Sequence, residues 1–180
     1  MTATSWCAIS LSASLLWGAI LWVSDRRIAR IWPPRRGNWI TAIWAWGLTI
    51  AIYMGLINAG SLDWNALGWP AWLRWGFGGV ILTLVSCWVQ GRGILDLGLE
   101  GTSGWDVGLV TTGTYARRRH PQYLGQIVSL MGLGVLFATI PALIAALAGS
   151  TALFYASLVE DRRLAEHPDH GAYRDRVRFF

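Results

Sequence analysis

Residues 124–159 read L-G-Q-I-V-S-L-M-G-L-G-V-L-F-A-T-I-P-A-L-I-A-A-L-A-G-S-T-A-L-F-Y-A-S-L-V, an apolar stretch interrupted near its middle by Pro141. Each half approaches the roughly 18–20 residues that an α-helix needs to cross a bilayer. Because Pro141 leaves no room for a true loop, the two halves predict a tight helical hairpin. Small residues spaced four apart, such as Ala145 and Gly149, allow transmembrane helices to approach closely.

The rest of the 180-residue chain has a similar character. Apolar residues make up 54% of it and charged residues only 14%, and the mean hydropathy is +0.40. A soluble domain usually carries about a quarter charged residues. The composition therefore predicts an all-α integral membrane protein that forms a single domain over residues 1–180. We expect five transmembrane spans, at about residues 5–23, 39–57, 71–89, 123–140 and 142–159.

All 15 basic residues are arginines, and most lie beside the predicted spans. They concentrate in residues 24–38, in residues 90–122 and in the C-terminal tail, whereas residues 58–70 contain Asp63 and no basic residue. The positive-inside rule then predicts an external N-terminus and a cytoplasmic C-terminus. Anionic headgroups explain the pI near 9.9 better than nucleic acid does, so no nucleic-acid partner is expected. Arg74, in the first turn of the third span, is predicted to snorkel outward.

A basic, glycine-punctuated segment, T-G-T-Y-A-R-R-R-H-P-Q-Y-L-G, leads from Thr112 to Gly125 into the fourth span. The preceding loop is predicted to begin at Gln90, which makes it long for a connection between packed helices and therefore suspect as functional. Pro121 suits the first position of a helix, where free amides and the helix dipole favour an anionic group. Arg117 and Arg118 are interpreted as the membrane-face anchor.

An acidic residue, Glu160, begins the charged tail at the end of the fifth span. Because the hairpin is antiparallel, its two polar ends lie at the same membrane depth, and we expect His120, Tyr123 and Glu160 to form one site. Two interpretations of Glu160 remain open. It could bind the hydroxyls or ammonium of a ligand, or it could pair with Arg163 or Arg119. The sequence predicts no metal site.

These motifs resemble the isoprenylcysteine carboxyl methyltransferase-like family of integral membrane methyltransferases, which is related to the phospholipid N-methyltransferases. The resemblance rests on G-x-Y and R-H-P-x-Y-x-G within residues 113–125, on the acidic pair at 160–161 and on the tail Y-R-D-R-V-R-F at 173–179. It implies a cytoplasmic S-adenosylmethionine pocket built by residues 108–125 and 156–180. The cofactor-binding residues that it implies are Gly113, Tyr115, Arg119, His120, Pro121, Tyr123, Gly125 and Glu160, with Arg163 and Tyr173 expected to contact the substrate.

The expected reaction is methyl transfer to a membrane lipid or a hydrophobic small molecule. S-adenosylmethionine carries its own leaving group, so the protein mainly aligns the acceptor with the methyl group and excludes water. No nucleophilic side chain is assigned. Ala156 stands where the prenylcysteine enzymes carry an arginine, which weakens the case for carboxyl methylation in particular. Oxygen, sulfur and nitrogen acceptors all remain open.

Two alternatives to a methyltransferase follow from the same residues. Membrane reductases related to sterol reductases share a similar R-H-P-x-Y-x-G element and use NADPH, although they are usually larger, with more spans before the motif. A non-catalytic membrane scaffold could also retain this fold. Binding of S-adenosylmethionine or of NADPH distinguishes the three hypotheses.

Overall fold

The computed structural model describes residues 1–29, 31–34, 37–105 and 107–180, and these residues are predominantly helical. Four helices are long and apolar enough to cross a membrane, and a shorter apolar helix, α4, accompanies them. The prediction of an all-α, multi-pass membrane protein is thereby confirmed. The elements are α1 (Ala3–Asp25), α2 (Trp39–Leu62), the π-helix η1 (Trp72–Leu84), which continues directly into α3 (Val85–Thr102), the short 3-10 helix η2 (Gly113–Ala116), α4 (Pro121–Phe137), α5 (Ile140–Leu164) and α6 (His170–Arg176).

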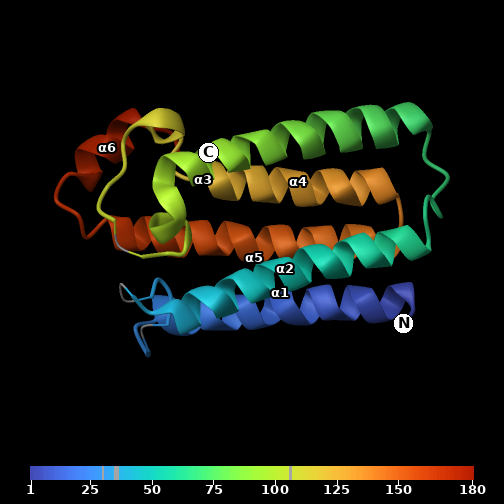
Figure 1. Ribbon diagram of the computed structural model, residues 1–180, viewed down its shortest axis with the longest axis horizontal. Helices are drawn as coiled ribbons and strands as arrows, with labels where there is room; N and C mark the ends of the chain where they lie inside the picture. The colour runs from blue at the N-terminus through green and yellow to red at the C-terminus, as the bar shows by residue number, and fades with distance from the viewer. Residues whose placement is uncertain (30, 35–36, 106) are drawn as a thin grey trace.

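Helix α5 lies in the middle of the bundle. It packs against α1 and α2 on one side and against α4 on the other, and α4 in turn packs against η1 and α3 (Figure 1). Ile52, Leu130 and Leu153 are almost fully buried where these helices meet. Gly149 of α5 permits this approach, because a Cβ there would lie 2.6 Å from the Cγ2 of Ile52.

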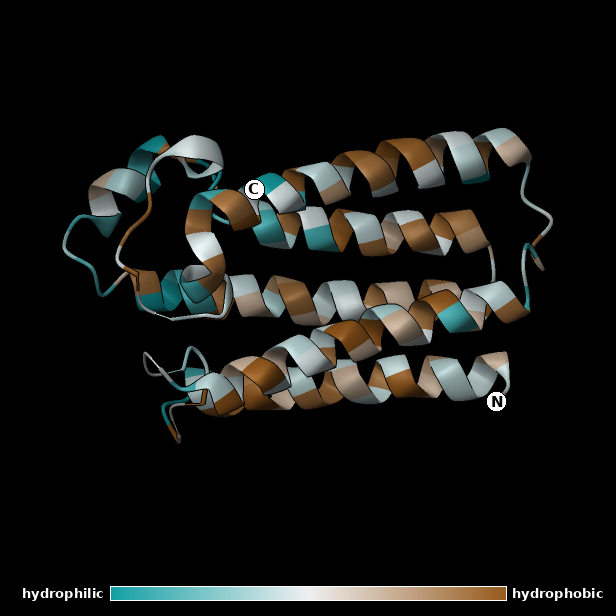
Figure 2. Cartoon of the chain, viewed as in Figure 1, coloured by the Kyte–Doolittle hydropathy of each residue, from teal (hydrophilic) through white to brown (hydrophobic). Residues whose placement is uncertain are grey.

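The polar segments gather at one end of the bundle, which we call the basic end. It comprises the described residues of the connection between α1 and α2, residues 103–105 and 107–120, and the tail with α6 (Figure 1). The N-terminus and the connections from α2 to η1 and from α4 to α5 lie at the opposite end. Hydrophilic colouring concentrates at the basic end, and apolar colouring dominates along the helices (Figure 2). The predicted arginine-rich segments thus share one face of the bundle.

The predicted start of the long loop at Gln90 is wrong, because α3 continues to Thr102. The polar, glycine-containing sequence after Val89 indicates a helix end when it is read locally. Tertiary packing overrides this signal, since Gly93 faces α4 and a Cβ there would lie 2.9 Å from the Cγ of Gln122. The chain bends instead at Gly98, whose φ of 75° interrupts the helix.

The predicted tight hairpin between α4 and α5 is confirmed. Only Ala138 and Thr139 separate the two helices, and the Thr139 side chain accepts a hydrogen bond from the backbone N–H of Ala142 as the N-cap of α5. Pro121 is the first residue of α4, also as predicted. Helix α5 continues beyond the predicted end at residue 159, to Leu164, so the acidic pair lies within this helix rather than after it.

Arg74 does not snorkel outward, and this prediction is wrong. Its side chain is buried, its Nε donates a 3.0 Å hydrogen bond to the carbonyl of Leu136, and its guanidinium lies 4.5 Å from the centre of the Trp64 ring. The last carbonyls of a helix lack intrahelical partners and carry a partial negative charge. The guanidinium therefore caps the C-terminus of α4 instead of reaching the headgroups.

Replacing Arg74 with glutamine is expected to lower the free energy of unfolding by about 1–3 kcal/mol, because a buried acceptor loses its charged donor. The thermal midpoint of the detergent-solubilised protein measures this change. Arg174→Gln serves as the control, since the Arg174 side chain is 58% exposed. Equal midpoints for the two variants would contradict the capping role.

Candidate functional site

The C-terminal tail lies alongside the entrance to α4. Arg118 and Arg178 form a parallel β-bridge, and the backbone N–H of Arg119 donates a 2.9 Å hydrogen bond to the carbonyl of Arg178. His120 is the N-cap residue of α4, and its ring centre lies 4.8 Å from that of Phe179. Two segments far apart in the sequence therefore build one wall of the site.

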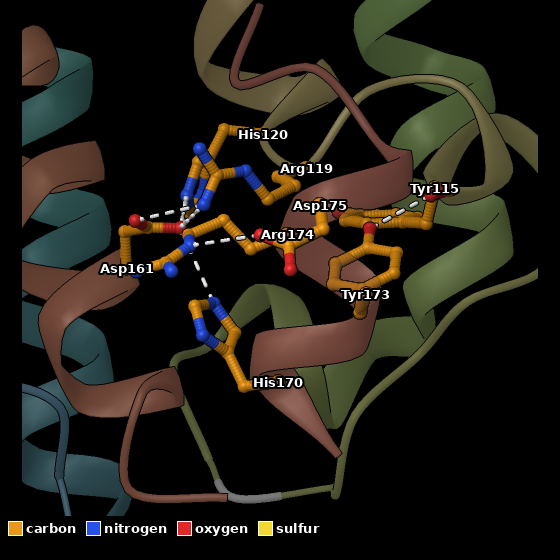
Figure 3. Close-up of polar contacts among 8 residues, drawn as sticks. All are labelled: Tyr115, Arg119, His120, Asp161, His170, Tyr173, Arg174 and Asp175. Carbon is orange, nitrogen blue, oxygen red and sulfur yellow. Dashed lines mark hydrogen bonds and ion pairs between the residues drawn. The ribbon is translucent and has the colours of Figure 1, made fainter.

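Asp161 is the charge centre of this wall (Figure 3). Arg119 Nη1 donates to both carboxylate oxygens, at 3.0 and 3.1 Å, and His120 Nε2 lies 3.2 Å from Oδ1. His170 Nε2 lies 3.5 Å from the same oxygen. Because Asp161 belongs to α5, this cluster fixes the start of α4 and the start of α6 against the end of the hairpin. We call these four residues the Asp161 cluster.

Glu160 does not join the Asp161 cluster. Successive residues on an α-helix point about 100° apart, so the two neighbouring carboxylates face different surroundings. In the part of the chain that the structure describes, no cation lies within ion-pair distance of Glu160. Of the two interpretations left open above, pairing with Arg119 or Arg163 is therefore not found. Arg119 pairs with Asp161, and Arg163 pairs with Glu166 at 3.7 Å.

Glu160 lines a cavity of about 330 Å³ at the basic end, which we call the basic-end cavity. Two donors in its walls, Arg119 Nε and Trp105 Nε1, are buried without a hydrogen-bond partner among the described residues. Buried polar groups are ordinarily hydrogen-bonded, so unpartnered donors beside a cavity indicate a place for ligand acceptors. Other walls are formed by Leu97, Tyr115, Arg163 and Tyr173.

Two further cavities continue from the basic-end cavity toward the middle of the bundle. A small one of about 20 Å³, the junction cavity, is lined by Tyr115, His120, Tyr123 and Glu160. A larger one of about 290 Å³, the bundle cavity, lies among the membrane-spanning helices and shares Tyr123 as a wall with the junction cavity. The predicted residues His120, Tyr123 and Glu160 therefore do meet in one place.

The two predicted tyrosines at the basic end are joined to each other. The hydroxyl of Tyr173 donates a 2.7 Å hydrogen bond to the backbone carbonyl of Tyr115. Burial raises the pKa of Tyr173 to about 12. Burial, and secondly the charge of Glu160, also raises the pKa of Tyr115 well above its ordinary value. Both phenols are therefore neutral at physiological pH and act as walls and donors rather than as bases.

Two predicted glycines shape the surroundings of the site rather than its cavities. Gly113 has a φ of 60°, and a Cβ there would lie 2.5 Å from the carboxylate of Asp96, which accepts a 2.7 Å hydrogen bond from the N–H of Thr114. A Cβ on Gly125 would lie 2.7 Å from Gln90, so this glycine allows α4 to pack against α3. Direct contact of either glycine with a cofactor stays a prediction.

Three residues of the site were not singled out from the sequence. Asp161 was considered only as one member of an acidic pair, and His170 was assigned no role. Phe179 was part of the tail motif without a role, although the Arg119 guanidinium lies 5.1 Å from the centre of its ring. The sequence shows two adjacent acids, and the predicted hairpin brings them close to the basic motif. It does not show which of the two acids faces the arginine and the histidine.

A Tyr173→Phe variant is expected to loosen the segment around η2 by about 1 kcal/mol, because the carbonyl of Tyr115 loses a buried donor. Hydrogen exchange of the backbone amides of residues 112–118 should become faster. Tyr155→Phe is the matched control, since the Tyr155 hydroxyl donates to Asp25 at the interface of α1 and α5. If exchange in residues 112–118 is the same in both variants, the Tyr173 bond does not hold this segment.

The sequence model of one family, described as phospholipid methyltransferase, matches residues 75–167, more than half of the chain. The match includes α3, α4 and α5 and therefore Glu160 and the Arg119–Asp161 pair, whereas His170, Tyr173 and Phe179 lie beyond it. No curated protein and no solved structure matches the chain at a significant level. The resemblance drawn from the motifs is confirmed, and the chain belongs to the phospholipid methyltransferase family of membrane methyltransferases.

Proposed function

We propose that this protein transfers a methyl group from S-adenosylmethionine to a lipid-like acceptor taken from the membrane. The observation that carries the proposal is the Glu160 carboxylate, which lines the basic-end cavity and has no cation paired with it among the described residues. A carboxylate has about four acceptor sites, so Glu160, which also interacts with the Tyr123 hydroxyl, can accept hydrogen bonds from an ammonium group or from ribose hydroxyls. The family membership supports the same reaction.

The donors and acceptors of the basic-end cavity suit S-adenosylmethionine. Its ammonium and hydroxyl groups match Glu160, and its carboxylate matches the unpartnered Nε of Arg119. The indole of Trp105 and the side chain of Leu97 offer apolar surface for the adenine ring. The volume of about 330 Å³ is within the range of ligand pockets, about 300–1,000 Å³.

When bound, S-adenosylmethionine supplies an electrophilic methyl group on a sulfonium sulfur that is its own leaving group. The residues of the chain then have to align the acceptor and exclude water. We place the transfer at the junction cavity, because Tyr115, Tyr123 and Glu160 line it and it shares walls with both the charged basic-end cavity and the uncharged bundle cavity. No general base is assigned, and the acceptor atom stays open among oxygen, sulfur and nitrogen.

The positive-inside rule puts the basic end, and with it the S-adenosylmethionine site, on the cytoplasmic side of the membrane. The N-terminus and the connection between α4 and α5 are at the other end of the bundle and would be external. Accessibility of single cysteines introduced at Asp169 and at Asp63 to a membrane-impermeant thiol reagent tests this orientation. Labelling at Asp169 but not at Asp63 in intact cells would reverse it.

Titration of the purified, detergent-solubilised protein with S-adenosylmethionine and with NADPH tests the proposed function. We expect saturable binding of S-adenosylmethionine and none of NADPH. Saturable binding of NADPH alone would favour the reductase, and binding of neither would favour the scaffold. Incubation with S-adenosylmethionine labelled in its methyl group and with a membrane lipid extract then identifies the acceptor by the molecule that becomes labelled.

A further inference from the structure

The bundle cavity, of about 290 Å³, lies between α2 and α3 at the level of the membrane-spanning helices. Ile50 and Met54 of α2 are among its walls, and both side chains are substantially exposed on the outer surface of the bundle. The cavity therefore borders the lipid-facing surface. Toward the basic end it shares Thr102, Gln122 and Tyr123 with the junction cavity.

Several polar groups in these walls have no partner. The side-chain amides of Gln90 on α3 and Gln126 on α4 make no hydrogen bond within the described residues, although both line the cavity. The indole Nε1 atoms of Trp17 and Trp32 are buried and also unpartnered there. By contrast, the Gln122 amide donates to the carbonyl of Gly93 and to the hydroxyl of Thr102, so it is part of the scaffold.

Unpartnered polar groups are unfavourable inside a membrane protein. An amide withdrawn from water without a hydrogen bond costs several kcal/mol in hydrocarbon, and polar residues within spans are therefore a default indication of function. Two buried indoles and two partly exposed amides, all without partners beside one cavity, indicate a ligand that carries hydrogen-bond donors and acceptors of its own. Glutamine amides supply both kinds of partner, and the indoles supply donors.

The walls of the bundle cavity carry no charge. None of its described lining residues is an arginine, aspartate, glutamate or histidine. The basic-end cavity differs, because Arg119, Glu160 and Arg163 line it. A phosphate or carboxylate placed in the bundle cavity would lose its hydration without gaining a counter-charge, which is strongly unfavourable in a medium of low dielectric constant.

From this contrast we propose that the bundle cavity is the site of the acceptor and selects amphiphiles whose head is uncharged and forms hydrogen bonds, such as a hydroxyl, amide or carbonyl group. The head lies against Gln90 and Gln126, and its chain extends past Ile50 and Met54 toward the lipid. This inference rests on the proposed function, since it takes the ligand of this cavity to be the methyl acceptor. The inference excludes methyl acceptors that carry an anionic group beside the reacting atom.

A set of four amphiphiles with the same alkyl chain tests the selectivity. Octadecanol and octadecanamide have neutral heads, and octadecyl phosphate and octadecyl sulfate have anionic heads. Each competes with tritiated octadecanamide for the full chain in phosphatidylcholine nanodiscs. We expect the neutral pair to compete at least about tenfold more strongly, and equal or stronger competition by the anionic pair would overturn the proposal.

A double variant, Gln90→Met with Gln126→Met, tests the site. Methionine preserves the length of the side chains and removes their hydrogen-bonding groups, so binding of octadecanamide should weaken by roughly tenfold. Thr151→Val is the control, because the Thr151 hydroxyl bonds within its own helix turn at an exposed position. Unchanged affinity in the double variant would contradict the assignment of these amides.

Binding of S-adenosylmethionine, measured on the same nanodiscs, separates the two proposals. If S-adenosylmethionine binds and the neutral amphiphiles show no preference, the acceptor inference fails and the proposed function stands. If the neutral preference is found but S-adenosylmethionine does not bind, the methyltransferase proposal fails and the bundle cavity is no acceptor site.

Discussion

An Asp161→Asn variant is expected to lose roughly 2–4 kcal/mol of stability and, with it, most of its affinity for S-adenosylmethionine. The side chains of Arg119 and His120 are only 10% and 1% exposed, so removing the carboxylate charge leaves a buried cation without its partner. Removing one member of a buried ion pair is far more destabilising than the net contribution of the pair. Because Asp161 itself is 20% exposed, solvent moderates the effect.

The loss of affinity follows from geometry rather than from direct contact with the cofactor. Arg119 lines the basic-end cavity, and the same guanidinium that bonds Asp161 carries the unpartnered Nε. Without the carboxylate, the guanidinium, the Phe179 ring beneath it and the start of α6 lose their common anchor. Asp169→Asn, at a side chain that is 82% exposed, is the control.

Two measurements check the Asp161 prediction. The thermal midpoint should fall in Asp161→Asn and stay near the wild-type value in Asp169→Asn. Titration with S-adenosylmethionine should likewise show weaker binding in Asp161→Asn and wild-type affinity in Asp169→Asn. An Asp161→Asn protein with the wild-type midpoint would mean that the Asp161 cluster does not stabilise the basic end. A normal midpoint combined with lost affinity would instead assign Asp161 to direct contact with the ligand.

The approximate positions of the apolar helices could be predicted from the sequence because they depend on the length of apolar runs. The hairpin was the clearest case, since Pro141 allows no loop and the structure leaves only Ala138 and Thr139 between α4 and α5. The end of the third helix could not be predicted. Gly91 and Gly93 weaken a helix locally, and the packing of Gly93 against Gln122 depends on a helix that lies far along the chain.

Polar side chains were the least predictable part of the fold. Arg74 was expected to reach the headgroups because arginines near helix ends commonly do so. The competing partner, the carbonyl of Leu136, belongs to a different helix, and no local pattern reveals it. The same limit applied at the site, where the basic motif was evident but Glu160, rather than Asp161, was the acid considered as its possible partner.

The neighbouring residues Glu160 and Asp161 therefore have different roles. Asp161 is surrounded by Arg119, His120 and His170 and acts as a structural anion. Glu160 points about 100° away from Asp161 around the helix and lines the basic-end cavity and the junction cavity. The shorter side chain of aspartate suits this structural position, because its cationic partners pack directly against α5.

A Glu160→Gln variant is expected to fold normally and to bind S-adenosylmethionine roughly 10- to 100-fold more weakly. Glu160 has no ion-pair partner among the described residues, so neutralising it breaks no salt bridge of the folded chain. A hydrogen bond to a charged acceptor is worth about 1.5–3 kcal/mol, which corresponds to this range of affinity. Glutamine keeps the shape of the side chain and removes its charge.

Comparison of Glu160→Gln with Asp161→Asn makes the prediction specific, because the two changes are chemically equivalent and adjacent. Isothermal titration with S-adenosylmethionine gives the affinity, and the thermal midpoint gives the stability. Glu160→Gln should change only the affinity, whereas Asp161→Asn should change both. Wild-type affinity in Glu160→Gln would remove the observation on which the proposed function rests. A fall in stability equal to that of Asp161→Asn would show that Glu160 is a second structural anion rather than a ligand contact.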